Sequence, residues 1–295
     1  MIGAIGLELD EGRVIGVRMS AQGAIEARTA IVGDDLVAAT EDALVQLLAL
    51  STDRPVIGLA SAAADAKPVA AAVAALAPRL GGSQRVVSSG TAAAVAESWI
   101  GAARGAGDVA YFAMADRTTA GLVRDGAPVT GSHGRAASVA WLSLNPVERE
   151  DYRRVGCLEA EVAASGVVRR LVWRIKTGDD SSVPDVVAND LAAITIEHVL
   201  EAARAGDGVS ISVVRDTAKY LGMAAANLVV ITDPEVLVLG GIMATAGDLL
   251  LDPLRAELAR RLPRPMLDGL AVVPAVLGAE APAIGAARLV APALP

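Results

Sequence analysis

The chain has 295 residues, of which 53% are hydrophobic and 20% are charged, enough apolar material for one large or two medium cores. Acidic residues outnumber basic residues by 34 to 26, and the net charge of −8 opposes binding to nucleic acid, which depends on neutralising phosphates. No apolar run approaches the roughly 20 residues that a membrane helix needs and no basic segment opens the chain, so we expect a cytoplasmic protein that contacts no membrane.

The first elements predict a strand meander followed by a helix and a further strand. Three apolar segments, separated by turn residues, are typical of antiparallel strands at 2–9, 14–19 and 24–30. Apolar residues at helical spacing then predict a helix over 36–50, and 55–59 is typical of a short buried strand.

The rest of the chain continues this alternation and then becomes mostly helical. Further strands are expected at 85–87, 108–114, 120–123, 236–239 and 270–274. Further helices are expected at 63–80, 91–103, 158–164, 167–175, 186–205, 213–228, 248–262 and 281–290. Because strand and helix alternate near the start and again after Asp108, the sequence predicts an α/β protein with two domains and a cleft.

Short motifs recur in a fixed order along most of the chain. They are residues 92–97, 120–123, 125–126, 131–134, 156–159, 202–207, 220–222, 225–228, 233–236, 238–241 and 285–287. In their order and spacing they are similar to the ROK (Repressor, ORF, Kinase) family of sugar kinases and regulators.

The resemblance implies an actin-like ATPase fold, which is ribonuclease H-like, with sugar and ATP meeting in a cleft. It implies a small α/β domain of residues 1–107 plus 281–295 and a larger α/β domain of residues 108–280. It also implies a homodimer that forms through the larger domain.

The residue that accepts the sugar's proton in family kinases has no carboxylate counterpart here. The family carries an Asp in an Asn-Asp-Ala-Asn motif, and the matching stretch Ser88-Ser89-Gly90-Thr91 places Ser89 at the base position. A neutral hydroxyl does not accept a proton at pH 7 without its own base, and losing general-base assistance costs roughly 10²- to 10⁴-fold in rate. The same four residues are typical of a helix N-cap.

The phosphate-binding loops of the family are altered as well. Residues 8–12, Glu-Leu-Asp-Glu-Gly, replace Asp-x-Gly-Gly-Thr, and Ala115-Asp116-Arg117-Thr118-Thr119 replaces Gly-Thr-Gly-x-Gly. Glycine allows backbone amides to approach phosphate, whereas added carboxylates repel it. On the adenosine side, Gly240 and Gly241 match the glycines that contact nucleotide in the family, although such a pair also serves in packing.

The sugar and zinc motifs are also replaced. Residues 137–141 stand where the family has Gly-Glu-Ile-Gly-His, and no family sugar loop occurs in 60–82. Residues 150–157 stand where the family has Cys-x-Cys-Gly-x-x-Gly-Cys, which leaves Cys157, the single cysteine, without a partner for a disulfide or a zinc site. We therefore expect no bound metal, and structural roles for His133 and His198.

These departures favour a pseudokinase, a non-catalytic homologue that acts as a ligand-sensing or interaction scaffold and needs no cofactor. The first alternative is a diverged ATP- and Mg²⁺-dependent kinase of sugars or other small molecules, with a site rebuilt around Glu8, Asp10 and Asp116. The second is a ROK-type transcriptional regulator without its DNA-binding domain, since Met1 directly precedes the first strand. As partners we expect a second copy of the chain and an unidentified small ligand or protein, but neither nucleic acid nor membrane.

Overall fold

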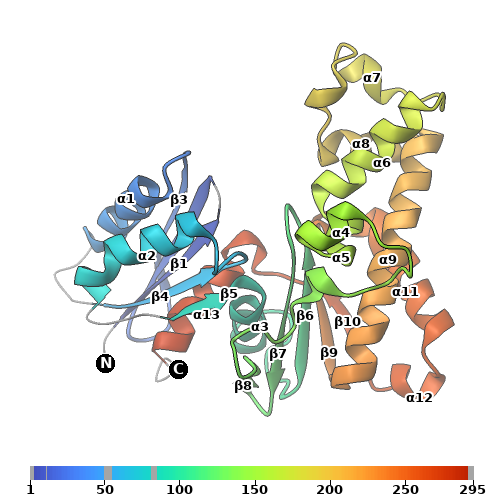
Figure 1. The fold of residues 1–295 in the computed structure, drawn as a ribbon. Coiled ribbons are helices and arrows are strands. Elements are labelled where there is room, and N and C mark those ends of the chain that lie inside the picture. Colours follow the sequence, from blue (N-terminus) through green and yellow to red (C-terminus); the bar gives the residue numbers. More distant parts are fainter. Residues whose placement is uncertain (1–2, 11, 50–54, 81–84, 292–295) are drawn as a thin grey trace. The chain divides into compact units, whose positions relative to one another are not determined.

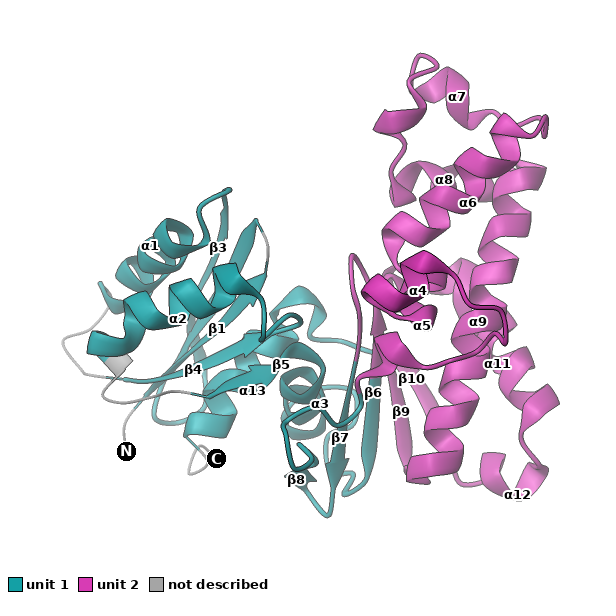
Figure 2. Cartoon of the chain, viewed as in Figure 1, with its two compact units in different colours: residues 1–111, 120–137, 275–295 teal, residues 112–119, 138–274 magenta. Residues whose placement is uncertain are grey.

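The structure, a computed structural model, describes residues 3–10, 12–49, 55–80 and 85–291 (Figure 1). The chain divides into two compact units, shown in different colours in Figure 2: residues 1–111, 120–137 and 275–295 form the first, and residues 112–119 and 138–274 the second. Both units combine strands and helices, in agreement with the predicted α/β class. The domain bounds at 107/108 and 280/281 stay a prediction.

The first sheet has five strands in the order β3-β2-β1-β4-β5. Their bounds are Ala4–Asp10 (β1), Arg13–Met19 (β2), Ile25–Val32 (β3), Val56–Ser61 (β4) and Val86–Ser88 (β5). The first three strands pair antiparallel, which confirms the predicted meander. Strands β4 and β5 continue the sheet from β1 in parallel, so their carboxyl ends lie at one edge.

Helices pack on both faces of this sheet. They are Leu36–Leu48 (α1), Lys67–Leu80 (α2), Ser89–Trp99 (α3) and Ala281–Val290 (α13). Alternate residues of a strand point to opposite faces. Leu7 of β1 accordingly joins the core formed with α1 and α2, whereas a Cβ at Gly6 would lie 1.8 Å from the carbonyl oxygen of Ala283 in α13. Helix α13 therefore lies directly on the sheet backbone.

The second sheet has the order β10-β9-β6-β7-β8. Its strands are Val109–Met114 (β6), Thr118–Arg124 (β7), Ala127–Pro128 (β8), Val236–Gly241 (β9) and Ala271–Pro274 (β10). The helices of the second unit are Glu150–Val155 (α4), Cys157–Val162 (α5), Ala164–Lys176 (α6), Val183–Val186 (α7), Ile196–Arg204 (α8), Gly208–Thr232 (α9), Ile242–Thr245 (α10), Gly247–Arg261 (α11) and Arg264–Leu267 (α12). No helix among the described residues is both long and apolar enough to cross a membrane.

The single helix predicted over 186–205 is wrong in its first half. Helix α7 ends at Val186, and Ala188 and Asn189 adopt left-handed φ angles of 49° and 64°, which a continuing helix does not allow. Helix α8 begins only after Thr195, whose backbone N–H donates to Nδ1 of His198 at 3.1 Å. His198 thus has a capping role in the structure.

Candidate functional site

The carboxyl ends of three parallel strands place the candidate site residues at one edge of the first sheet. Glu8 lies near the end of β1, and Ser89 follows β5 directly, with β4 between the two strands. In the strand register Glu8 pairs with Ala60, and Ser61 pairs with Ser88. The edge at the carboxyl ends of parallel strands is the usual place for ligands in α/β proteins.

Ser88 and Ser89 have different roles although they are neighbours. Ser88 caps α3: its Oγ accepts a hydrogen bond from the backbone N–H of Thr91 at 3.1 Å and donates one to Oγ1 of Thr91 at 2.8 Å. This confirms the predicted N-cap. The Ser89 side chain is only 3% exposed, and its Oγ has no hydrogen-bond partner of ordinary geometry among the described residues. Burying a hydroxyl group without a hydrogen-bond partner costs about 1–3 kcal/mol of stability. Because Ser88 is the capping residue, helix capping does not account for a serine at position 89.

A carboxyl group lies beside this serine. Glu8 is 8% exposed, and burial raises its pKa to about 7. The Ser89 hydroxyl and Arg13 lower this pKa and Asp10 raises it further, but burial is the largest of these influences. Although the Ser89 Oγ forms no hydrogen bond of ordinary geometry, its hydroxyl is close enough to favour the ionised form of Glu8. A carboxyl group whose pKa lies near neutral pH is well suited to act as a general base.

Two glycines fix the backbone on which Ser89 sits. A Cβ at Gly90 would lie 2.0 Å from the carbonyl oxygen of Ala120, and a Cβ at Gly121 would lie 2.1 Å from the carbonyl oxygen of Gly90. The first turn of α3 therefore contacts β7 backbone to backbone, a distance that only glycine permits. This contact holds the position of Ser89 firmly.

The turn between β1 and β2 contains Gly12, which stands at the Thr position of the family's Asp-x-Gly-Gly-Thr motif, whereas Asp10 and Glu11 replace the two glycines. Gly12 has a φ angle of 76°, and a Cβ placed there would meet nothing within 4 Å. Asp10 pairs in register with Arg13 across the turn, while Glu11 lies outside the described residues. The open space at Gly12 is compatible with an approaching phosphate, although the neighbouring Asp10 adds like charge.

Two backbone N–H groups of the loop at 115–119 already donate hydrogen bonds to other groups of the protein. The Ala115 N–H donates to the Arg117 carbonyl oxygen at 2.9 Å, and the Thr118 N–H donates to Oε2 of Glu159 at 3.0 Å. Asp116 is exposed and belongs to the second unit, whereas Glu8 and Asp10 belong to the first. Because Glu159 already occupies the Thr118 amide, this loop fits a phosphate less well than the turn at Gly12.

Gly240 and Gly241 end strand β9, as predicted. Gly240 is buried, and Gly241 has a φ angle of 61° at the start of α10. A Cβ at Gly241 would lie 2.1 Å from the carbonyl oxygen of Met114, so packing by itself requires glycine there. A contact of these glycines with nucleotide stays a prediction.

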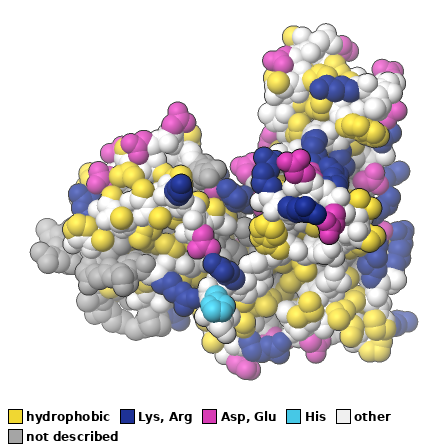
Figure 3. All heavy atoms as spheres, viewed as in Figure 1, with side chains coloured by type: hydrophobic (Ala, Val, Ile, Leu, Met, Phe, Trp, Pro, Cys, Tyr) yellow, Lys and Arg dark blue, Asp and Glu magenta, His cyan; other side chains and the backbone are white. Residues whose placement is uncertain are grey.

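The segment that replaces the zinc motif is built around buried Glu161. Its carboxylate accepts hydrogen bonds from the Tyr152 hydroxyl at 2.5 Å and from Arg149 and Arg170, each at 3.2 Å. Cys157 packs in a small apolar cluster with Tyr152. Figure 3 shows acidic and basic side chains next to one another over α4 to α6. Among the described residues, no three or more His, Cys, Asp or Glu side chains are grouped so as to hold a metal ion.

The segment that replaces the family's sugar-binding Glu and His is short and partly exposed. Ala137 has a left-handed φ angle of 58°, and Trp141 is 58% exposed. His133 is exposed in the preceding loop. Residues 137–141 provide no carboxylate or imidazole at the positions of the family motif. A sugar site that differs from that of the family therefore stays a prediction.

The comparisons with known proteins identify relatives in one family. The ROK family model matches residues 72–293. The glucokinase of Halalkalibacterium halodurans is 32% identical over 201 residues, 67% of this chain and 60% of that protein. The DNA-binding transcriptional dual regulator NagC of Escherichia coli K12 is 27% identical over 198 residues, 67% of this chain and 47% of that protein. The chain thus spans less than two thirds of the length of either relative.

Solved structures show the same fold. The ROK family glucokinase of Streptomyces griseus, in complex with glucose and AMPPNP, superposes with a TM-score of 0.80 at 22% identity, covering 98% of this chain and 99% of that chain. The predicted actin-like ATPase fold is therefore confirmed.

These findings correct the interpretation of the chain as a pseudokinase. A named glucokinase is its relative at 32% identity, and a second glucokinase shares its fold over nearly the whole chain. Position 89 is not the only possible source of a proton acceptor, because the Glu8 carboxyl lies beside Ser89 and has a pKa of about 7. Since the family match extends over most of its residues, this chain belongs to the ROK family.

Proposed function

We propose that this chain is an ATP-dependent kinase that phosphorylates a hydroxyl group of a sugar, with a rebuilt proton-accepting site made by Glu8 and Ser89. Family membership and the glucokinase relatives support the reaction class. The observation that carries the proposal is the buried Glu8 carboxyl, with a pKa of about 7, beside the unpartnered Ser89 hydroxyl.

The reaction requires a group that removes the proton of the attacking hydroxyl. The sugar oxygen forms a bond to the γ-phosphorus of ATP, the bond between that phosphorus and the bridging oxygen breaks, and ADP leaves. Ser89 Oγ accepts the proton of the sugar hydroxyl while its own proton passes to the Glu8 carboxylate. Because both side chains are buried in the free protein, the bound sugar must displace neighbouring side chains to reach Ser89.

Only some of the residues expected to bind ATP, the phosphoryl donor, match the motifs of the family. Gly12 leaves open space at the β1–β2 turn, and Gly240 and Gly241 match the family's adenosine contact. Glu159 competes for the Thr118 amide and adds negative charge near the second loop. We therefore expect a KM for ATP above that of kinases whose two loops are rich in glycine.

An assay of ADP formation tests the proposal. The purified chain is incubated with Mg²⁺ and ATP and with glucose, N-acetylglucosamine, mannose or xylose, one at a time. ADP formation that depends on one of these sugars is expected, with a rate reduced at least about 10²-fold in Glu8→Gln. Glu26→Gln, which changes an exposed carboxylate of the same unit, should leave the rate unchanged. Saturable sugar binding without ADP formation would instead indicate a sensor and contradict the proposal.

A rescue variant separates the proton acceptor from a structural role of Glu8. In the Glu8→Gln background, Ser89→Asp restores a carboxylate at the base position of the family. The double variant should regain activity if the missing function is proton acceptance. If Ser89→Asp leaves Glu8→Gln inactive while both variants unfold at or above the wild-type temperature, proton acceptance at this position is not what Glu8 supplies.

A further inference from the structure

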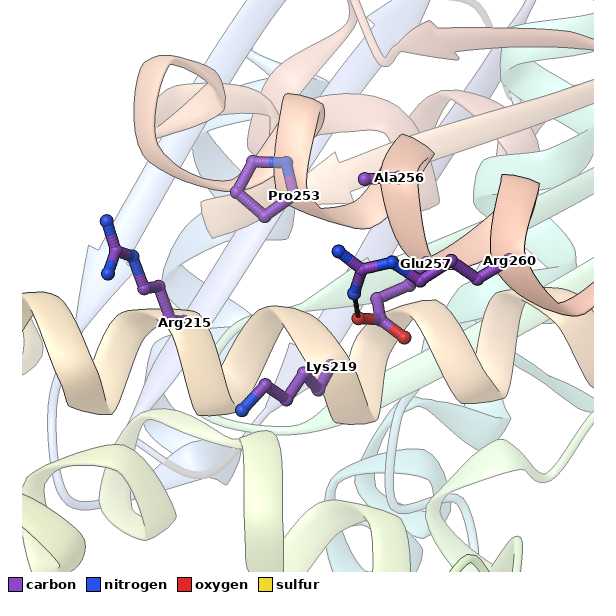
Figure 4. Close-up of a pocket in the computed structure, with 6 residues that line it drawn as sticks. All are labelled: Arg215, Lys219, Pro253, Ala256, Glu257 and Arg260. Carbon is purple, nitrogen blue, oxygen red and sulfur yellow. Dashed lines mark hydrogen bonds and ion pairs between the residues drawn. The ribbon is translucent and has the colours of Figure 1, made fainter.

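A pocket of about 210 Å³ lies between two long helices of the second unit (Figure 4). Its lining residues are Arg215 and Lys219 of α9 and Pro253, Ala256, Glu257 and Arg260 of α11. None of them belongs to the first unit, which contains Glu8 and Ser89. The pocket is thus distinct in its residues from the site of the proposed phosphoryl transfer.

The sequence explains why a hollow forms at this place. A Cβ at Gly222 of α9 would lie 2.3 Å from Cβ of Glu257, so the two helices approach each other closely there. Lys219 and Arg215 lie about one and two turns earlier on α9. On α11, the pocket is lined by the ring of Pro253, the short side chain of Ala256 and the long cationic side chain of Arg260.

The pocket has an excess of positive charge. Its lining contains three cations and one carboxylate, a net charge of +2 in a chain whose net charge is −8. The carboxylate of Glu257 is 6% exposed and already accepts hydrogen bonds from Arg260 at 2.6 Å and from Arg261 at 3.0 Å. The negative charge of Glu257 is therefore neutralised inside the protein.

The three cationic side chains that line the pocket have N–H groups that are still able to donate hydrogen bonds to a ligand. Among the described residues, Arg215 makes no hydrogen bond or ion pair, although most arginines of the second unit do. Lys219 donates to Asp216 at 2.9 Å, in an exposed pair that contributes little to stability. Arg260 uses only Nη1 toward Glu257. A planar guanidinium with free N–H groups is well suited to bind a doubly charged oxyanion.

We propose that this pocket binds the phosphate group of a small phosphorylated metabolite, as a second ligand site. The net charge of +2 matches a phosphate dianion, and the volume accommodates a phosphate with a small polar body. Nucleic acid is disfavoured as the source of the phosphate, because the rest of the acidic chain repels a polyanion.

Isothermal titration calorimetry tests the site, with inorganic phosphate, glucose 6-phosphate and uncharged glucose as probes. The wild-type chain should bind both phosphate compounds with a Kd in the micromolar to millimolar range, and more weakly as salt increases. Arg215→Ala combined with Arg260→Ala should raise that Kd at least about 10-fold, the loss expected for removing two charge-assisted contacts. The control is Arg255→Ala, on α11 but outside the pocket and paired with exposed Asp252.

Two results would overturn the assignment. One is the absence of saturable binding of either phosphate compound to the wild-type chain. The other is an unchanged Kd in the double variant, which would place the bound phosphate elsewhere, including at the proposed kinase site. Glu8→Gln, tested in parallel, should retain the binding, so that failure of the proposed kinase function and failure of this pocket give different results.

Discussion

The carboxylate of Glu97 in α3 accepts a hydrogen bond from the backbone N–H of Leu277 at 3.0 Å, although the two residues are 180 positions apart in the sequence. The same oxygen accepts from the Val276 N–H at 3.1 Å, and the other oxygen accepts from the Ala102 N–H at 2.7 Å. Glu97 is fully buried. It therefore connects α3 to the segment that leads into α13 and helps to return the end of the chain to the first unit.

Replacing Glu97 by alanine should destabilise the protein strongly. The substitution leaves three backbone N–H groups without their partner, and hydrogen bonds to a charged group contribute about 1.5–3 kcal/mol each. We expect the free energy of unfolding to fall by at least about 3 kcal/mol, measured by urea denaturation. Glu97→Gln keeps one acceptor oxygen, so its free energy of unfolding should fall by roughly half as much. Equal losses in the two variants would show that these hydrogen bonds do not determine the effect.

Gly285 tests the close packing of α13 on α3. A Cβ at this position would lie 1.8 Å from the carbonyl oxygen of Ala92, a backbone atom that moves only with its helix. Gly285→Ala should therefore lower the free energy of unfolding by about 1–3 kcal/mol. Gly33→Ala is the matched control in the same unit, because a Cβ there meets nothing within 4 Å. A thermal unfolding scan in which both variants behave alike would contradict this packing.

The strands and most helices of the first unit were predicted from the sequence because their apolar spacing is regular. The break between α7 and α8 was missed, since the left-handed backbone of Ala188 and Asn189 leaves no mark in the apolar spacing. Glu8 was recognised as a candidate for a rebuilt site, but its proximity to Ser89 depends on the strand order β1-β4-β5, which periodicity does not provide. Homodimer formation and a protein partner remain predictions.

The ion pairs around Glu161 should stabilise the segment that replaces the zinc motif. Glu161→Gln removes the charge that faces Arg149 and Arg170, and the Arg170 side chain is only 19% exposed. Breaking a buried pair costs about 3–5 kcal/mol, and because Arg149 is partly exposed we expect a loss near the lower end. Glu148→Gln is the control, since its partner Arg153 and Glu148 itself are exposed. Equal urea midpoints for the two variants would contradict a stabilising role of Glu161.

The raised pKa of Glu8 predicts how stability depends on pH. Between its ordinary value of 4.5 and about 7, Glu8 holds its proton in the folded state but releases it in the unfolded state. The folded state then binds more protons, so the contribution of Glu8 to stability falls as pH rises through this window, by about 3 kcal/mol in total. Glu8→Gln cannot ionise and should be more stable than wild type at pH 8 by about that amount.

Urea denaturation of both proteins at pH 5 and pH 8 measures this effect. The difference between wild type and Glu8→Gln should be small at pH 5 and large at pH 8. Glu41→Gln serves as the control, because Glu41 is an exposed residue of helix α1 in the same unit. A pH-independent difference between wild type and Glu8→Gln would show that the carboxyl group is not strongly perturbed by burial.

The pH dependence of kcat/KM for sugar phosphorylation tests the role of Glu8 most directly. If Glu8 accepts the proton, kcat/KM rises with pH through an apparent pKa of about 7 and then levels off, because only the ionised carboxylate is active. In Glu8→Gln this rise should disappear together with at least about 10²-fold of the rate. A Glu8→Gln enzyme that keeps the wild-type rate and the same rise near pH 7 would contradict the account.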